Sequence, residues 1–102
     1  MKLALPQDQI EAYCRRWKIT ELAVFGSVLR EDFHDDSDVD VLVTFAPEAR
    51  WSLFDLVTMQ DELKAILGRE VDLMTRKGVE QSRNPIRRES ILGSARPIYQ
   101  AA

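Results

Sequence analysis

Two aspartates one residue apart, in the segment Asp38-Val39-Asp40, are the side chains best suited to chemistry in this sequence. In a strand, residues i and i+2 point to the same face, so we expect the two carboxylates to project side by side. Adjacent carboxylates repel each other unless a cation neutralises them. Because Mg²⁺ binds carboxylate oxygens together with substrate phosphates, the pair predicts a metal site.

A third aspartate, Asp72, lies between Val71 and Leu73 in a second segment that alternates in the same way. If the two strands are neighbours, Asp72 joins Asp38 and Asp40 on one face of the sheet. Alternating Asp and Val is also the plain pattern of a half-buried strand with one solvated face. The metal interpretation therefore depends on the third carboxylate, since three together are hard to explain without a cation.

The dipeptide Gly26-Ser27 could supply the complementary half of such a site. Glycine lets the backbone approach a ligand closely, and the start of a following helix presents free N–H groups to phosphate. Arg30, one helical turn further on, could reach a phosphate with its planar guanidinium. Gly-Ser before a helix is also a common structural turn. Followed by a carboxylate pair, however, it provides what metal-assisted nucleotidyl transfer requires.

The elements that must position these residues are predicted from hydrophobic periodicity, caps and turn residues. They describe an α/β (α+β) domain with a small mixed β-sheet flanked by helices. We expect helices over residues 6–17, 28–32, 52–67 and 84–92, strands over 19–25, 38–45 and 70–75, and a brief edge strand over 96–99.

Two of the expected helices carry an apolar stripe that should face the sheet. The first stripe consists of Ile10, Tyr13, Cys14 and Trp17, and the second of Leu53, Leu56, Val57, Leu63 and Leu67. Cys14 is accordingly expected to be a small core residue and not a nucleophile. Pro6 is expected at the start of the first helix, and Gly68 at the end of the long one.

Length and composition set the remaining bounds. The 102 residues, 45% apolar and 30% charged, fit one domain over residues 1–102. Neither a transmembrane run nor a secretory signal is present in the sequence pattern. The single cysteine excludes an internal disulfide framework and a CxxC site. We therefore expect a cytoplasmic protein that contacts no membrane.

Charge is distributed unevenly along the chain. Residues 1–75 carry 8 basic and 15 acidic side chains, whereas residues 76–102 carry 6 basic and 2 acidic ones. A basic tail can bind nucleic acid, but here it is interleaved with apolar residues, which favours a solvated helix face or a partner-docking surface over residues 84–99. Three of its arginines, Arg83, Arg87 and Arg88, could instead meet phosphates or an acidic partner.

The complete pattern resembles a known signature. Gly26-Ser27, ten residues, and then Asp38-Val39-Asp40, with Asp72 downstream, is similar to the motif of the nucleotidyltransferase superfamily related to DNA polymerase beta. The short length and the form GSxxR…SDxD resemble the minimal nucleotidyltransferases (MNT), the antitoxin half of HEPN–MNT toxin–antitoxin pairs. The resemblance extends from the first strand to the final SARPIY. Glu31 departs from it, since many relatives have a small residue at that position.

The resemblance implies a polymerase beta-like fold and a set of roles. Asp38 and Asp40 would hold two Mg²⁺ ions with the triphosphate of ATP, while Asp72 would bind the catalytic metal and help to deprotonate the acceptor. Gly26, Ser27 and Arg30 would bind the nucleotide. In MNT proteins the acceptor is a tyrosine of the partner HEPN ribonuclease, which is AMPylated and thereby silenced.

Two other functions remain open: a nucleotidyltransferase acting on a small molecule or an RNA end, and a non-catalytic antitoxin that covers its toxin. The intact acid triad favours an enzyme, and the short chain favours a site completed by a partner protein without direct nucleic-acid contact. Three further residues are expected to be structural: His34 in a polar loop, and Trp17 and Trp51 in packing.

Overall fold

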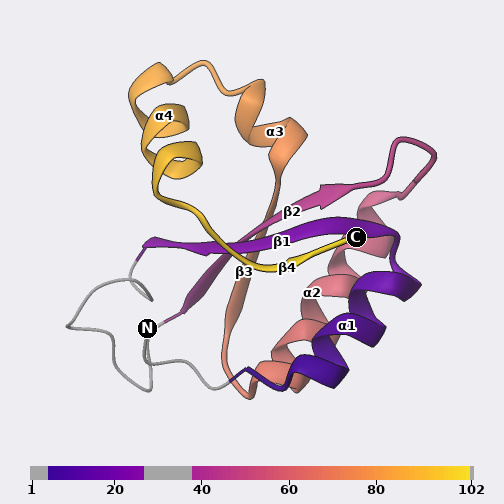
Figure 1. Ribbon diagram of the computed structural model, residues 1–102. Helices are drawn as coiled ribbons and strands as arrows, with labels where there is room; N and C mark the ends of the chain where they lie inside the picture. Colours follow the sequence, from indigo (N-terminus) through magenta and orange to yellow (C-terminus); the bar gives the residue numbers. More distant parts are fainter. Residues whose placement is uncertain (1–4, 27–37, 102) are drawn as a thin grey trace.

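A mixed four-stranded sheet runs through the computed structural model, which describes residues 5–26 and 38–101 (Figure 1). In chain order the elements are α1 (Gln7–Arg16), β1 (Ile19–Phe25), β2 (Val39–Phe45), α2 (Leu53–Leu67), β3 (Val71–Thr75), α3 (Arg76–Glu80), α4 (Pro85–Ser94) and β4 (Arg96–Gln100). The expected helix over 28–32 and the loop containing His34 lie outside the described residues.

The strands lie in the order β3-β2-β1-β4. β1 is antiparallel to both β2 and β4, whereas β2 and β3 are parallel and are joined through α2. Parallel neighbours need such a crossover helix. This topology confirms the predicted mixed sheet and fulfils the condition that the second and third strands are neighbours.

The two faces of the sheet carry separate apolar clusters. On one face, β2 residues Val39, Val41 and Val43 pack with buried side chains of α1 and α2. On the other face, Leu42 packs with Ala23 and Phe25 of β1 and with one residue each from α3 and α4. Figure 1 shows the same division, with α1 and α2 together on one side of the sheet and α3 and α4 on the other. Strand alternation therefore places every second β2 residue under α3 and α4.

The predicted ends of α2 are close to the observed ones. Ser52 caps the helix in a capping box with Asp55, and Gly68 ends it in the left-handed conformation. The predicted apolar stripe is partly wrong, because Leu53 is 79% exposed and Val57 is 58% exposed, whereas Leu63 is fully buried. Since a helix turns by about 100° per residue, Val57 lies roughly 120° around the axis from Leu63 and cannot share its face.

Helix α3 was not among the predicted elements. Its five residues follow β3 without a loop, and the Thr75 hydroxyl accepts a hydrogen bond from the Gly78 backbone N–H at 3.1 Å. Thr75 was assigned only as the end of a strand, although threonine is also a favourable N-cap residue. Other boundaries differ by one or two residues: Pro6 precedes α1 as its N-cap, β2 begins at Val39, and α4 continues to Ser94.

Three of the residues predicted to be structural lie in the described part of the chain and are packed. Trp17 and Trp51 meet edge to face with ring centroids 5.2 Å apart, and the Trp51 indole N–H donates to the Trp17 carbonyl at 3.0 Å. Cys14 is buried, and this burial raises the pKa of its thiol to about 12, which keeps it protonated at neutral pH. Among the described helices, none is long and apolar enough to cross a membrane.

A matched pair of leucine truncations tests the orientation of α2. Leu63→Ala removes a fully buried side chain and should lower the free energy of unfolding by about 2–5 kcal/mol. Leu53→Ala, in the same helix but 79% exposed, should change it by less than about 0.5 kcal/mol. Urea titration followed by circular dichroism measures both values, and similar losses in the two variants would contradict the observed helix face.

Candidate active site

Two of the predicted carboxylates lie directly beside each other in the sheet. In the parallel pairing of β2 with β3, Asp40 is in register with Asp72. The pairing begins just before these residues, where the Val39 backbone N–H donates to the Glu70 carbonyl at 2.9 Å. Residues paired in register project to the same face, so both carboxylates lie on the α3–α4 side of the sheet. The conditional prediction that Asp72 joins Asp40 is thereby confirmed at the level of strand register.

Gly26 lies directly against the Asp40 side chain, at the end of β1. It follows Phe25, which pairs with Asp40 across β1 and β2, and its backbone has a φ of +75°. A Cβ atom at this position would lie 3.3 Å from the Asp40 Cγ and closer still to Oδ2. Only glycine is compatible both with this backbone conformation and with this approach. The close contact of Gly26 with Asp40 brings the two halves of the predicted motif together.

The electrostatics of Asp40 reflect this position. Partial burial raises the pKa of its carboxyl above the ordinary 3.8, and the negative charges of Asp72 and Asp38 raise it further. The positive charge of Arg87 on α4 acts in the opposite direction. Two neighbouring carboxylates are thus close enough to act on Asp40, and additional positive charge would stabilise its ionised form.

The described side chains do not by themselves form a complete metal site. Asp38 is exposed immediately before β2, two residues from Asp40. Within residues 5–26 and 38–101, no three side chains of His, Cys, Asp or Glu are gathered so that they could hold a metal ion. Repulsion between carboxylates provides a physical reason for an open arrangement. The donor chemistry still suits Mg²⁺, which binds through one or two carboxylates plus substrate phosphates. Ser27 and Arg30 lie outside the described part of the chain.

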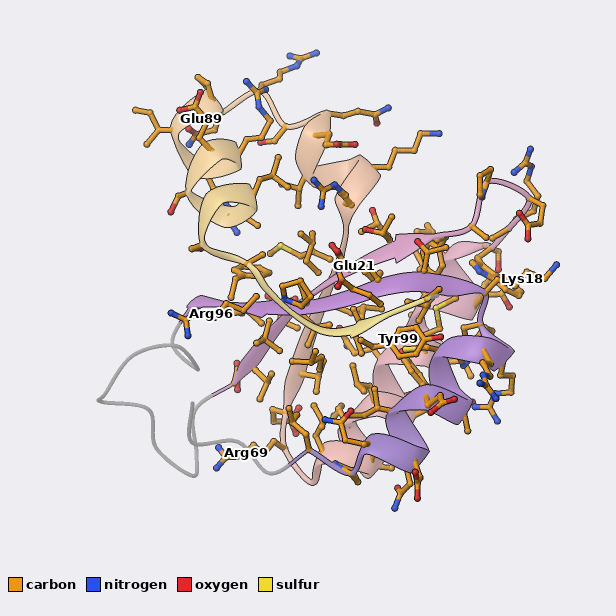
Figure 2. The ribbon with its side chains drawn as sticks, in the orientation of Figure 1. Lys18, Glu21, Arg69, Glu89, Arg96 and Tyr99 are labelled. Atoms are coloured by element: carbon orange, nitrogen blue, oxygen red, sulfur yellow. The ribbon has the colours of Figure 1, made fainter. Side chains whose placement is uncertain are left out.

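Two arginines at this end of the sheet were not among the predicted site residues. Arg87 was assigned either to a solvated helix face or to phosphate contact, and its charge acts on Asp40. Arg96 of β4 is paired with Val24, close to the end of β1 that leads into Gly26. Because Val24 belongs to the α1–α2 cluster, Arg96 lies across β1 from Asp40 and on the other face of the sheet. Figure 2 shows its exposed side chain at that end of the sheet. No sequence spacing indicated Arg96, because its position depends on pairing between the first and last strands.

The chain also matches a known family along most of its length. The profile of the nucleotidyltransferase domain matches residues 7–97. The chain belongs to the nucleotidyltransferase family. This confirms the resemblance drawn from the motif, and identifies the protein as a nucleotidyltransferase enzyme with the polymerase beta-like fold.

Curated relatives are named for one type of transfer. Protein adenylyltransferase MntA of Thermococcus cleftensis is 38% identical over 65 residues, which are 64% of this nucleotidyltransferase and 64% of that protein. A protein of Methanocaldococcus jannaschii, provisionally named a protein adenylyltransferase, is 36% identical over 77 residues, which are 76% of each chain.

Solved structures share the fold. A provisionally identified minimal nucleotidyltransferase superposes with a TM-score of 0.68 at 32% identity, over 90% of this chain and 88% of that one. A toxin–antitoxin crystal structure with AMP-PNP superposes with a TM-score of 0.71 at 19% identity, over 95% of this chain and 75% of that one. The nucleotidyltransferase fold therefore accounts for nearly the whole chain.

Replacing Asp40 by Asn should stabilise the protein in the absence of divalent cations. The folded state raises the pKa of Asp40 above the ordinary value of 3.8. The contribution of this carboxyl group to stability is therefore fully present below pH 3.8 and is lost as the pH rises through the folded-state pKa. The melting temperature of Asp40→Asn should thus exceed that of the wild type at pH 7 in EDTA, and the difference should vanish below about pH 3.8. Asp61→Asn on the exposed side of α2 is the control and should show no comparable gain. A melting temperature of Asp40→Asn at or below the wild-type value at pH 7 would contradict the raised pKa of Asp40.

Alanine at position 26 should be costly for two separable reasons. Gly68 also has a positive φ, of 67°, but a Cβ there would meet no atom within 4 Å. Gly68→Ala therefore measures the backbone cost alone, about 1–2 kcal/mol of unfolding free energy. Gly26→Ala adds the collision with Asp40 and should lose clearly more in the same denaturant titration. Equal losses would show that Asp40 does not restrict position 26.

Proposed function

We propose that this nucleotidyltransferase is a Mg²⁺-dependent protein adenylyltransferase that moves AMP from ATP to a tyrosine of a partner HEPN ribonuclease toxin, and so acts as an antitoxin. The observation that carries the proposal is the contact of Gly26 with Asp40 at the point where Asp40 is in register with Asp72. At this point a backbone that phosphate could approach closely lies beside two carboxylates that could bind a cation.

Asp38, Asp40 and Asp72 are the residues that would hold the metal. Two Mg²⁺ ions would supply charge for the phosphates and for the attacking and leaving oxygens of an in-line displacement. Gly26, with Ser27 and Arg30 after it, would bind the triphosphate through backbone N–H groups, a hydroxyl and a guanidinium. The Arg87 guanidinium adds positive charge that acts on Asp40.

The proposed transfer exchanges one phosphorus–oxygen bond for another. The acceptor oxygen attacks the α-phosphorus of ATP, the bond to the β-phosphate oxygen breaks, and pyrophosphate leaves. The phenolic proton must be accepted as the new bond forms, and Asp72, on the exposed edge strand, is the carboxylate best placed to face an incoming acceptor.

Several observations favour a protein acceptor. The curated relatives are named protein adenylyltransferases, and a structure of the same fold is a toxin–antitoxin pair. Asp72 is exposed on the edge strand of the described sheet, where a partner protein could reach it. An added AMP would bring negative charge to a ribonuclease and oppose RNA binding.

Intact-mass spectrometry of the co-expressed partner after incubation with ATP and Mg²⁺ tests the proposal. We expect a gain of one or more AMP units with the wild type. Asp72→Asn should reduce the rate of transfer by at least ~100-fold, because both a metal ligand and a proton acceptor are lost. Asp61→Asn, which removes an exposed carboxylate on α2, should transfer at the wild-type rate.

The alternatives give different results in this experiment. A silenced partner without any gain in mass would support the non-catalytic antitoxin and overturn the proposal. Release of pyrophosphate only on addition of a small molecule or RNA would support the other nucleotidyltransferase activity. Full transfer by Asp72→Asn would refute the assigned role of Asp72.

A further inference from the structure

A small cavity lies between the end of β3 and the two helices that cover this face of the sheet. Its volume is about 240 Å³. Its lining combines an apolar floor with hydroxyl groups and two arginines, and comprises Met74, Thr75, Gly78, Val79, Ser82, Arg87, Arg88 and Ile91. Sites that hold a whole drug-sized ligand occupy roughly 300–1,000 Å³, so the size suits a single ring system.

Strand register places this cavity next to the carboxylates. Met74 is two residues beyond Asp72 and is paired with Leu42, which is two residues beyond Asp40. Because residues i and i+2 share a face about 7 Å apart, the cavity floor begins one step along the sheet from the acid pair. Arg87 connects the two regions, since it lines the cavity and its charge acts on Asp40.

The polar groups of the cavity retain capacity for a ligand. The Thr75 hydroxyl accepts from the Gly78 N–H at 3.1 Å, and the Ser82 hydroxyl accepts from the Asn84 N–H at 3.3 Å. Each hydroxyl thus keeps an O–H to donate, and neither donates to another described residue. Ring nitrogens of a nucleobase are acceptors for such donors. By contrast, the Arg88 guanidinium donates to the Ser82 carbonyl at 2.9 Å and so holds α4 against the turn before it.

We propose that this cavity binds the adenine base of ATP, with Arg87 at the boundary between base and phosphates. The inference rests on the proposed use of ATP at Asp40 and Asp72. An apolar floor of Met74, Val79 and Ile91 removes the ring from water, and a guanidinium plane can stack on it. The cavity thereby gives this nucleotidyltransferase a means of preferring a nucleoside triphosphate to a bare polyphosphate.

Equilibrium binding of ATP and of inorganic tripolyphosphate, each with Mg²⁺, tests the cavity without any partner protein. Isothermal titration calorimetry should show that the wild type binds ATP at least about tenfold more tightly than tripolyphosphate. Ser82→Phe places a ring in the cavity and should remove this preference while leaving tripolyphosphate affinity unchanged. Ser90→Phe, on α4 but outside the cavity lining, should retain the preference.

A second pair of variants tests the cavity independently, in case Ser82→Phe does not fold. Arg87→Ala changes an exposed side chain and should weaken ATP binding at least about fivefold, whereas Arg83→Ala, exposed in the turn before α4, should not. Equal wild-type affinities for ATP and tripolyphosphate, or an unchanged preference in a folded Ser82→Phe, would overturn the inference. An ATP preference that depends on Ser82 and Arg87 without any AMP transfer would refute the proposed function alone.

Discussion

Mutual repulsion between neighbouring carboxylates is the constraint around which this site is organised. Asp40 and Asp72 are held in register by backbone hydrogen bonding between two parallel strands, so they cannot move apart as two surface side chains could. Burial is the largest cause that raises the pKa of Asp40, and the charges of Asp72 and Asp38 raise it further. This arrangement places electrostatic free energy where a bound cation can release it.

The rest of the fold can be understood as the support that keeps this pair in register. Helix α2 carries the chain from the end of β2 to the start of β3, and its capping box and left-handed Gly68 fix where it begins and ends. The valines of β2 are buried against α1 and α2, so a slip of one residue would bury Asp40 and expose the core. Gln60 on α2 also accepts from the Leu73 N–H at 3.1 Å, which ties the edge strand to the helix next to Asp72.

Local sequence patterns predicted the parts of the site that depend on local geometry. Alternation along 38–45 and 70–75 correctly indicated that each strand has an acid face and an apolar face, and Ser52 and Gly68 marked the ends of α2. Patterns could not show that the acid face lies beneath α3 and α4, because α3 is short and has no apolar period. Nor could they place Arg87 or the cavity next to the acid face, since both depend on how the C-terminal elements pack. The assignment of all 102 residues to a single domain stays a prediction. The same holds for the catalytic and binding roles of the three aspartates and of Gly26, Ser27 and Arg30.

The contact between Gly26 and Asp40 joins two positions that are fourteen residues apart in the chain into one steric unit. The glycine of a phosphate-binding turn is usually explained by the ligand, which needs a bare backbone. Here the protein's own carboxylate already occupies the space that a side chain would fill. Mutational effects at the two positions should therefore be non-additive: once position 40 is shortened to alanine, a methyl group at position 26 carries only its backbone cost. Selection on either residue constrains the other, even when no nucleotide is bound.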